Sequence, residues 1–509
     1  MTVSFARGTS AAAVFIISAQ GAFADVSAQD VWSDWKAYMT GTGYTVTGTE
    51  SQSGNVLTVS DISMTMPLPE DEGSAGLTMP AIEFVENGDG TVNVMLPKEF
   101  PMAFVANGDS PNENFSAEIL YTHDGAPMVV SGDTSAMTYD YATGLASVTL
   151  GKINAEGEDI PADLLSMTVM MKDLVAKTEM QIAGERSYVQ TQSVAELTYD
   201  LAFNDPDSDD AGMAKGSIQN LTGTANSIIP TGLDSGALLP DLIKAGFSVT
   251  ADLAYTGGNS TISVSGSDSF DMATTSAGGK FGVSMSESGL SYDIGQHDIT
   301  VNVSGSEIPF PLALTMAETG FKLAMPVSKS EEQQDFALGV TLRDFAVPEM
   351  LWGMVDPTGA LPHDPATIVL DLAGKGKLLF DMLDPEAIEA MEKGDQEPGE
   401  FNAVSIKQLL VSAAGAKLTG TGDFTFNNED LVTFDGMPAP DGTANIQLEG
   451  ANGLIDNLIT MGLVSDSDAM GARMMMGMFG VPGEGEDTLT SEIKVSEDGQ
   501  IHANGQRIK

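Results

Sequence analysis

The sequence predicts a mainly β protein of extended, twisted antiparallel sheets, arranged as a meander that forms a groove or a sandwich and carries a few short capping helices. Three observations predict this class. Apolar residues alternate with polar ones at a period of two, which places them on one face of a strand. Turns rich in Gly, Asn and Asp separate these runs at short intervals, and helical patterns seldom intervene, as in antiparallel meanders.

The alternation is clearest in the middle of the chain and recurs in the N-terminal half. The central runs are 262–264, 281–285, 290–294, 299–303, 321–327 and 336–342, and the earlier ones are 115–121, 197–203 and 247–255. Each predicted strand has one apolar face and one face of Ser, Thr, Gly and Asp. A second sheet, helices or curling of the sheet into a trough is needed to cover the apolar face.

A helix is predicted at the start of the mature chain. Ser27 can cap it, with Asp30 at its third position. The residues that then share one helical stripe are Ala28, Val31, Trp32, Trp35, Tyr38 and Met39. Lys36 is the only cation beside Asp30 and Asp34, which favours a helix that caps the sheet over one that lies on a membrane surface.

Further short helices are expected near 384–394 and 454–480, where Pro385 and Gly480 mark a start and an end. The predicted organisation has three parts. They are a signal peptide at 1–24, an N-terminal β-rich region with the leading amphipathic helix at 25–235, and a C-terminal β-rich region with the short helices at 236–509.

The first 24 residues are typical of a cleaved secretory signal peptide. Arg7 is the only charge, residues 11–18 are apolar, and Ala22 and Ala24 form a small-x-small cleavage site ahead of Asp25. A membrane anchor is the competing interpretation, but the apolar stretch is far shorter than the ~20 residues that cross a bilayer. We therefore expect a periplasmic protein without a transmembrane anchor, with the cell surface or the extracellular space as the alternative.

The composition excludes several classes of function. There are 72 acidic against 22 basic residues, a formal charge of −50, which repels nucleic acid and anionic lipid headgroups. This acidity is typical of a protein kept soluble in a salty habitat, and an acidic face that collects divalent cations stays open as an alternative. There is no Cys, so disulfides, thiolate zinc sites and thiol catalysis are excluded.

No catalytic motif is present, and an enzyme is not expected. The four histidines, His123, His297, His363 and His502, are widely spaced in sequence and are interpreted as isolated structural or surface side chains. Neither a cofactor nor a catalytic residue is predicted.

Alternating acids make one weak candidate for a metal site. Asp205, Asp207 and Asp209 lie in a loop that lacks the Gly and Glu of an EF-hand, so a solvated acidic loop is the favoured interpretation.

A methionine cluster is the second candidate site. Met470, Met474 and Met478 recur at helical spacing, with Met475 beside them. Thioethers can bind Cu(I). They also fill gaps in a core or adapt to a lipid-like ligand, and these two interpretations are favoured.

One stretch carries a family resemblance. The chain resembles the alphaproteobacterial domain of unknown function 2125 family in this stretch and in its ending. The stretch comprises residues 344–352, 355–357, 361–365 and 368–372, and the ending comprises 422–424, 441–444, 452–456 and 503–507. The ending is more distantly similar to the C-terminal region of AsmA-like envelope proteins. These are long β-groove proteins linked to lipid movement between bacterial membranes, and this chain differs from them in having no N-terminal membrane anchor.

Three functional hypotheses follow. The first is a non-catalytic periplasmic β-groove protein that binds lipid or another hydrophobic ligand. The second is a structural or cell-surface protein with a closed sandwich core, whose partners are other envelope proteins. The third, an enzyme acting on envelope material, has no motif in its favour.

Overall fold

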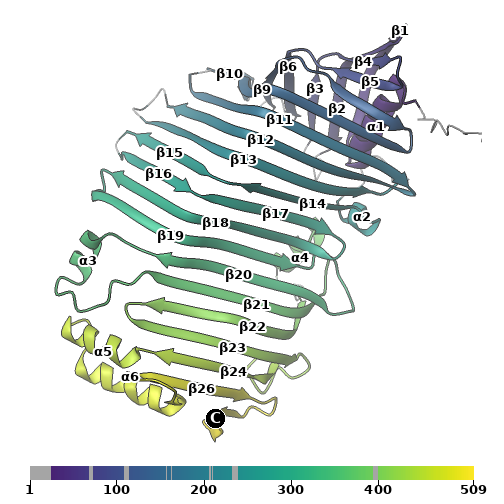
Figure 1. The fold of residues 1–509 in the computed structure, drawn as a ribbon. Coiled ribbons are helices and arrows are strands. Elements are labelled where there is room, and N and C mark those ends of the chain that lie inside the picture. Colours follow the sequence, from purple (N-terminus) through teal and green to yellow (C-terminus); the bar gives the residue numbers. More distant parts are fainter. Residues whose placement is uncertain are drawn as a thin grey trace, which may run out of the picture.

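The computed structural model describes residues 25–67, 73–107, 114–155, 157–161, 163–205, 208, 210–231, 239–266, 268–393 and 399–509. The predicted signal peptide at 1–24 lies outside this part. Strands hold 64% of the residues and helices 12%, and the strands form one large antiparallel sheet. The predicted mainly β class is therefore confirmed (Figure 1).

The described helices are short, and each is named here with its bounds. They are α1 (Ala28–Gly41), α2 (Leu239–Lys244), α3 (Glu349–Val355), α4 (Pro385–Glu392), α5 (Ala451–Thr460) and α6 (Asp466–Phe479).

The strands of the N-terminal half are β1 (Thr45–Ser53), β2 (Val56–Pro67), β3 (Ser74–Met79), β4 (Ile82–Asn87), β5 (Thr91–Met95), β6 (Glu99–Asn107), β7 (Phe115–His123), β8 (Met128–Asp133), β9 (Ala136–Ala155), β10 (Glu158–Ile160), β11 (Leu165–Ala183), β12 (Glu185–Asn204) and β13 (Ala211–Ile229). Those that follow are β14 (Ser248–Tyr255), β15 (Gly258–Ser265), β16 (Phe270–Ser276), β17 (Gly278–Ser286), β18 (Gly289–Gly305), β19 (Ile308–Met325), β20 (Gln334–Phe345), β21 (Ala366–Leu378), β22 (Gly399–Ala413), β23 (Ala416–Asn427), β24 (Ala439–Glu449), β25 (Val481–Pro482), β26 (Thr488–Val495), β27 (Ile501–Ala503) and β28 (Gln506–Arg507).

The long strands stand side by side almost in chain order, from β9 to β26 (Figure 1). β14 and β15 lie end to end along β13, and β16 and β17 lie end to end along β18. The expected boundary between 235 and 236 lies outside the described residues. The sheet continues past it, because β13 pairs with β14 and β15.

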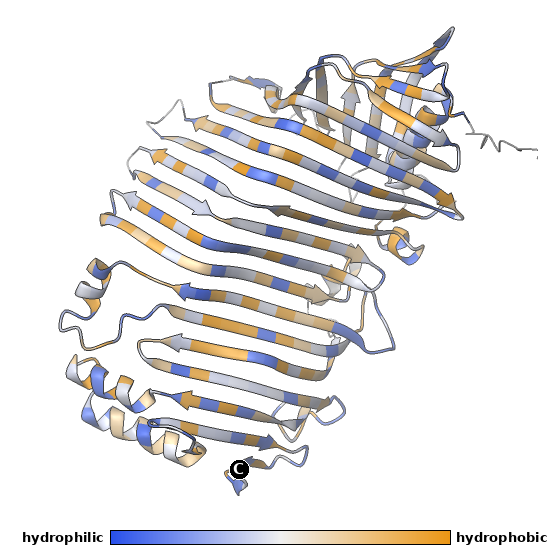
Figure 2. Ribbon diagram, in the orientation of Figure 1, coloured by the Kyte–Doolittle hydropathy of each residue, from blue (hydrophilic) through white to orange (hydrophobic). Residues whose placement is uncertain are grey.

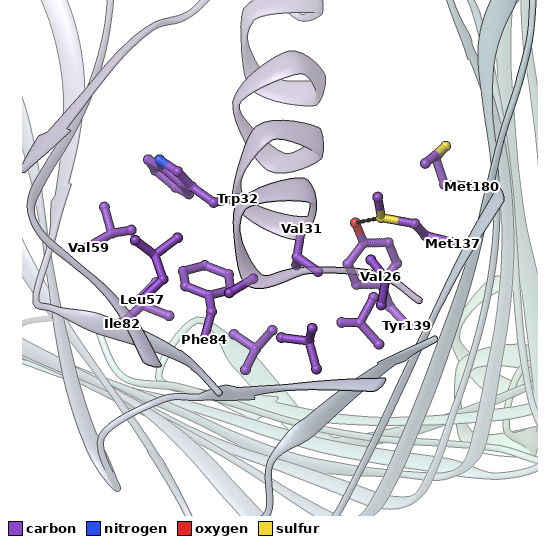
Figure 3. Close-up of a cluster of buried hydrophobic side chains, with 14 of the residues drawn as sticks. Val26, Val31, Trp32, Leu57, Val59, Ile82, Phe84, Met137, Tyr139 and Met180 are labelled. Atoms are coloured by element: carbon purple, nitrogen blue, oxygen red, sulfur yellow. Dashed lines mark hydrogen bonds between the residues drawn. The ribbon is translucent and has the colours of Figure 1, made fainter. Parts of the chain in front are cut away.

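The main hydrophobic core lies at the N-terminal end, where the sheet wraps around α1 (Figure 3). Between β2 and β9 the strands follow two routes, one through β3, β6 and β7 and the other through β4, β5 and β8. Ser27 caps α1 and Asp30 completes the capping box, as predicted. Val31 and Trp32 are fully buried against Phe84 and its neighbours, so α1 caps this end of the sheet.

The side-chain alternation changes phase within several long strands. Asp173, Asn220, Asp298 and Asp344 have φ of 49, 49, 51 and 51°. In β18 the apolar residues occupy even positions before Asp298 and odd positions after it: Leu290, Tyr292, Ile294, then Ile299, Val301, Val303. The runs 290–294 and 299–303, separate in sequence, are thus one strand in which a left-handed residue breaks the alternation.

The apolar side chains stay on one side of the sheet across this phase change. In β9 the change falls at Thr143 and Gly144. Tyr141 precedes it, and Tyr121 of β7 pairs with Val148 beyond it. The two tyrosine hydroxyls nevertheless lie 2.8 Å apart, so both side chains project to the same side. The phase change keeps one face of the sheet apolar along the full length of the strands.

Asp298→Val should lower the free energy of unfolding by about 1–2 kcal/mol, because a β-branched residue adopts the left-handed conformation at a steric cost. Asp298→Gly should be tolerated, since glycine adopts it freely. Asn302→Val, an exposed extended position in the same strand, is the matched control and should change stability by no more than about 0.5 kcal/mol. Urea unfolding midpoints measure all three, and equal midpoints for the two valine variants would contradict the prediction.

Candidate functional site

The candidate site is the apolar face of the sheet between the two covered ends. Phe281, Ile294, Phe321 and Val340 are successive register partners on β17 to β20. Their side chains remain 38, 39, 41 and 38% exposed. Such a run of exposed large apolar side chains marks an interaction surface.

A second row runs parallel to the first and two residues along each strand. Its members are Val283, Tyr292, Leu323, Leu338, Leu372 and Ile406. Figure 2 shows the resulting alternation of hydrophobic and hydrophilic residues along the long strands. The face therefore forms a continuous apolar strip, which we define as the apolar residues of these two rows on β17 to β22.

The opposite face of the sheet is polar. Its basic side chains pair with carboxylates on neighbouring strands or two residues away: Lys172–Glu196, Lys177–Glu179, Lys215–Asp200, Lys280–Asp293, Arg343–Glu318, Lys375–Asp335 and Lys417–Glu449. Exposed pairs of this kind add little stability. They show instead that this face is built for water, so the two faces differ sharply in chemistry.

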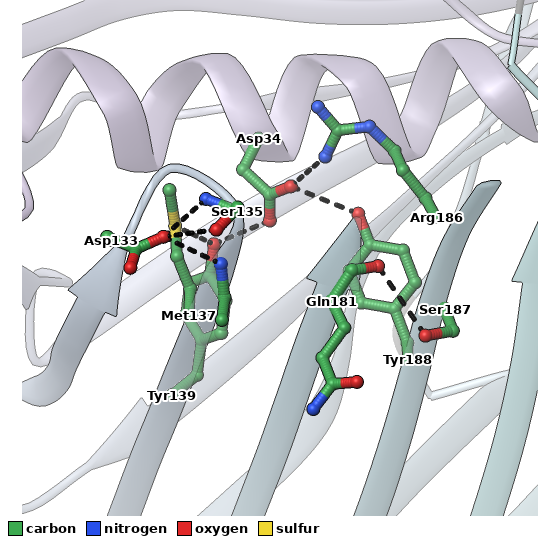
Figure 4. Close-up of polar contacts among 10 residues, drawn as sticks. Asp34, Asp133, Ser135, Met137, Tyr139, Gln181, Arg186, Ser187 and Tyr188 are labelled. Carbon is green, nitrogen blue, oxygen red and sulfur yellow. Dashed lines mark hydrogen bonds and ion pairs between the residues drawn. The ribbon is translucent and has the colours of Figure 1, made fainter. Parts of the chain in front are cut away.

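At the N-terminal end, α1 covers the apolar face through a buried carboxylate (Figure 4). Asp34 is 3% exposed, accepts hydrogen bonds from the hydroxyls of Tyr139 at 2.6 Å and Tyr188 at 3.2 Å, and pairs with Arg186. Burial raises the pKa of both tyrosines above the ordinary value of a tyrosine hydroxyl, and the negative charge of Asp34 is the second cause of the rise. A cavity of about 260 Å³ lies beside this cluster, between Trp35 and Tyr38 of α1 and the sheet.

At the C-terminal end, α6 covers the apolar face. A cavity of about 550 Å³ lies beneath it. Met476 and Phe479 line this cavity, and Ala469 is buried. The predicted methionine cluster lies mainly on the outer side of α6: Met470, Met474, Met475 and Met478 are 67, 67, 61 and 56% exposed, and of these Met475 also lines the cavity.

The structure describes only one residue of the acidic candidate site. Asp205 accepts a hydrogen bond from Ser208 at 2.9 Å, while Asp207 and Asp209 lie outside the described residues. Within the residues that the structure describes, no three His, Asp or Glu side chains gather closely enough to hold a metal ion.

Two of the histidines are built into the fold. His123 is buried and bonds to the Pro97 carbonyl at 3.0 Å. His363 stacks on Trp352, with ring centroids 4.4 Å apart, and its Nδ1 lies 2.9 Å from Glu349. Its Nε2 lies 3.9 Å from Asp356. The spacing of Trp352 and His363 around a Pro-rich loop was the available signal for this cluster, which closes the connection from β20 to β21.

Asp356→Asn should destabilise the protein at neutral pH and not in strong acid. Asp356 is 2% exposed and accepts hydrogen bonds from the Leu361 amide at 2.6 Å and the Thr358 hydroxyl at 2.9 Å. These hydrogen bonds lower the pKa of Asp356 to about 2, and the bond from the Leu361 amide makes the largest contribution. A depressed pKa contributes stability that is present above the unfolded-state value of about 3.9 and is lost as the pH falls through about 2.

The measurement is the urea midpoint of the native protein and of Asp356→Asn between pH 7 and pH 2. The difference between the two should be constant above pH ~5 and should fall to a small fraction of that value at pH 2. A difference that persists unchanged to pH 2 would contradict this account of Asp356.

Comparison with known proteins gives one family. A family model described as an uncharacterised protein conserved in bacteria, domain of unknown function 2125, matches residues 233–503. No curated protein matches the sequence. No helix in the described part of the chain is long and apolar enough to cross a membrane.

Proposed function

This chain belongs to the bacterial domain of unknown function 2125 family, and we propose that it is an exported envelope protein that binds lipid or another hydrophobic molecule along its apolar strip, without catalysing a reaction. The apolar strip is the observation that carries the proposal. Its side chains keep more than a third of their surface exposed in the row from Phe281 to Val340, which is costly in water unless a ligand covers them.

The dimensions of the apolar face support a lipid. The strands from β13 to β24 stand side by side, so at ~4.8 Å per strand the face runs for roughly 40 Å. One leaflet of a bilayer has a hydrocarbon thickness of roughly 15 Å. The face is thus long enough for more than one acyl chain, and α1 and α6 cover its two ends.

The charge of the protein supports a neutral lipid and a place in the envelope. A chain with a formal charge of −50 repels anionic headgroups, so a zwitterionic or uncharged headgroup fits best. The segment at 1–24 supports export to the periplasm. Release of the protein by osmotic shock, and not with the culture medium, is the expected result of fractionation.

The proposal predicts a lipid bound to the native protein and lost from a variant of the strip. Phe321 and Lys322 are neighbours on β19 that project to opposite faces, and both are exposed. Phe321→Glu places a carboxylate in the apolar strip and should lower the bound lipid at least about tenfold, because a carboxylate without a partner is costly in an apolar contact. Lys322→Glu adds the same side chain on the polar face and should leave the bound lipid unchanged.

Mass spectrometry of solvent extracts from the natively purified proteins measures the bound lipid per chain. The absence of stoichiometric lipid from the native protein overturns the proposal. Equal lipid contents for the two glutamate variants would show that the lipid is held elsewhere. A stable dimer that carries no lipid would show instead that a second copy of the chain covers the strip.

A further inference from the structure

The cavity beneath α6 is continuous with the apolar strip. Ile368, Val411, Leu418, Leu448 and Leu489 form one register row from β21 to β26. The first two are 44 and 37% exposed, whereas the last three line the cavity. The same row of apolar side chains therefore runs from the uncovered part of the sheet to the part beneath α6.

Gly420 carries no side chain on the apolar face of β23, directly opposite Ile446, which lines the cavity. Gly420 lies two residues from Leu418 on the same face of β23, between Leu409 and Ile446. A Cβ atom placed there would meet nothing nearer than 3.5 Å, at the Asn445 carbonyl and the Leu409 side chain. A larger residue would thus fit locally and occupy the entrance from the strip to the cavity.

The walls of the cavity accept only an apolar guest. Its floor is formed by Leu418, Leu448 and Leu489 and its roof by Met475, Met476 and Phe479. Of the residues that the structure describes, no charged side chain lines it, and the Ser491 hydroxyl is already bonded to the Phe479 carbonyl at 2.6 Å. A peptide segment would bury N–H and C=O groups here without partners, which excludes it in favour of a hydrocarbon chain.

The volume fits a long chain. The cavity has a volume of about 550 Å³. This is more than three times the ~150 Å³ of an apolar cavity that binds a benzene ring. By that comparison it has room for an alkyl chain of roughly 18 carbons. Flexible methionine side chains in the roof adapt to guests of varied shape.

We propose that the cavity beneath α6 is a binding site for the end of a single long alkyl chain, which enters from the apolar strip past Gly420. This inference rests on the proposed lipid-binding function and adds where a hydrocarbon tail ends. A monoacylglycerol and a phosphatidylcholine, neither of which has a net charge, both supply such a tail.

Photolabelling of the full mature chain tests the site. The probes are a monopalmitoylglycerol that carries a diazirine at the terminal carbon of its chain and a phosphatidylcholine that carries the same chain. After irradiation, the label should map by mass spectrometry to peptides of α6 and β26. Label at these peptides from the monoacylglycerol alone or from the phosphatidylcholine as well supports the site and identifies the source of the tail.

The other outcomes separate the two proposals. Label confined to β17–β21 overturns the cavity as a tail site and leaves lipid binding to the strip in place. No label on any peptide overturns both.

A matched pair of variants tests the entrance. Gly420→Leu should fill the entrance with its side chain, lower the labelling of α6 and β26 about tenfold, and leave the labelling of β17–β21 unchanged. Thr419→Leu adds the same side chain on the polar face of β23 and should label as the native protein does. Unchanged α6 labelling in a folded Gly420→Leu variant overturns the route past Gly420. If that variant fails to fold, the map on the native chain decides.

Discussion

Replacing Asp34 with alanine should lower the free energy of unfolding by about 3–5 kcal/mol, one of the two largest effects that we expect. The substitution removes the acceptor of the Tyr139 and Tyr188 hydroxyls and the partner of Arg186, whose side chain is only 20% exposed. A buried guanidinium without its carboxylate is the dominant cost. Urea unfolding followed by tryptophan fluorescence measures it, because Trp32 and Trp35 lie on the same helix.

Two controls separate the buried cluster from the loss of a charge. Asp200→Ala breaks the ion pair with Lys215, in which both side chains are about half exposed, and should cost under about 1 kcal/mol. Asp34→Leu combined with Arg186→Leu removes both charges and should recover much of the loss. If Asp34→Ala and Asp200→Ala unfold at the same urea concentration, the cluster is not the link between α1 and the sheet.

The class of the fold and the first helix were predictable because both depend on local patterns. Period-two alternation selects strands, and Ser27 with Asp30 specifies a helix start from four consecutive residues. The position of Asp298 was also visible, as a break between the runs 290–294 and 299–303. The effect of Asp298 on the strand could not be predicted, because a break in alternation fits a loop between two strands as well as one strand with a left-handed residue.

The role of Asp34 could not be predicted from its neighbours. In sequence it is one of the acids on the polar side of a helix. Its partners Tyr139, Arg186 and Tyr188 lie 105, 152 and 154 residues away. Only the wrapping of the sheet around α1 brings these groups together.

The side of α6 that faces the sheet could not be predicted from the sequence either. Spacing of three and four places Met470, Met474 and Met478 on one stripe, but it does not say which stripe packs inward. The structure turns Met476 and Phe479 toward the sheet instead and buries Ala469. Whether an apolar sheet face is covered is a similar question, since covered and uncovered strands have the same alternation.

Trp32→Ala should be as damaging as the loss of Asp34, with a cost of about 3–5 kcal/mol. Trp32 is 1% exposed, packs on Phe84 at 6.1 Å between ring centroids, and donates its indole N–H to Glu50 at 2.6 Å. Truncation leaves a cavity in the main hydrophobic core of the described chain and removes one of the hydrogen bonds that Glu50 accepts, while those from Lys36 and Gln29 remain. Among the described residues, this core cluster contains none from β17 to β22.

Hydrogen exchange resolves where the stability is lost. Trp32→Ala should lower the protection of amides in β1–β9 first, because these strands wrap α1, while β18–β22 keep theirs at low denaturant. Trp352→Ala is the matched control: this ring stacks on His363 at the edge of the sheet and is less buried, so its loss should cost under about 2 kcal/mol and leave β1–β9 protected. Equal loss of protection in both halves for Trp32→Ala would mean that the whole sheet unfolds as one unit, and that α1 stabilises the apolar strip as well as the end that it covers.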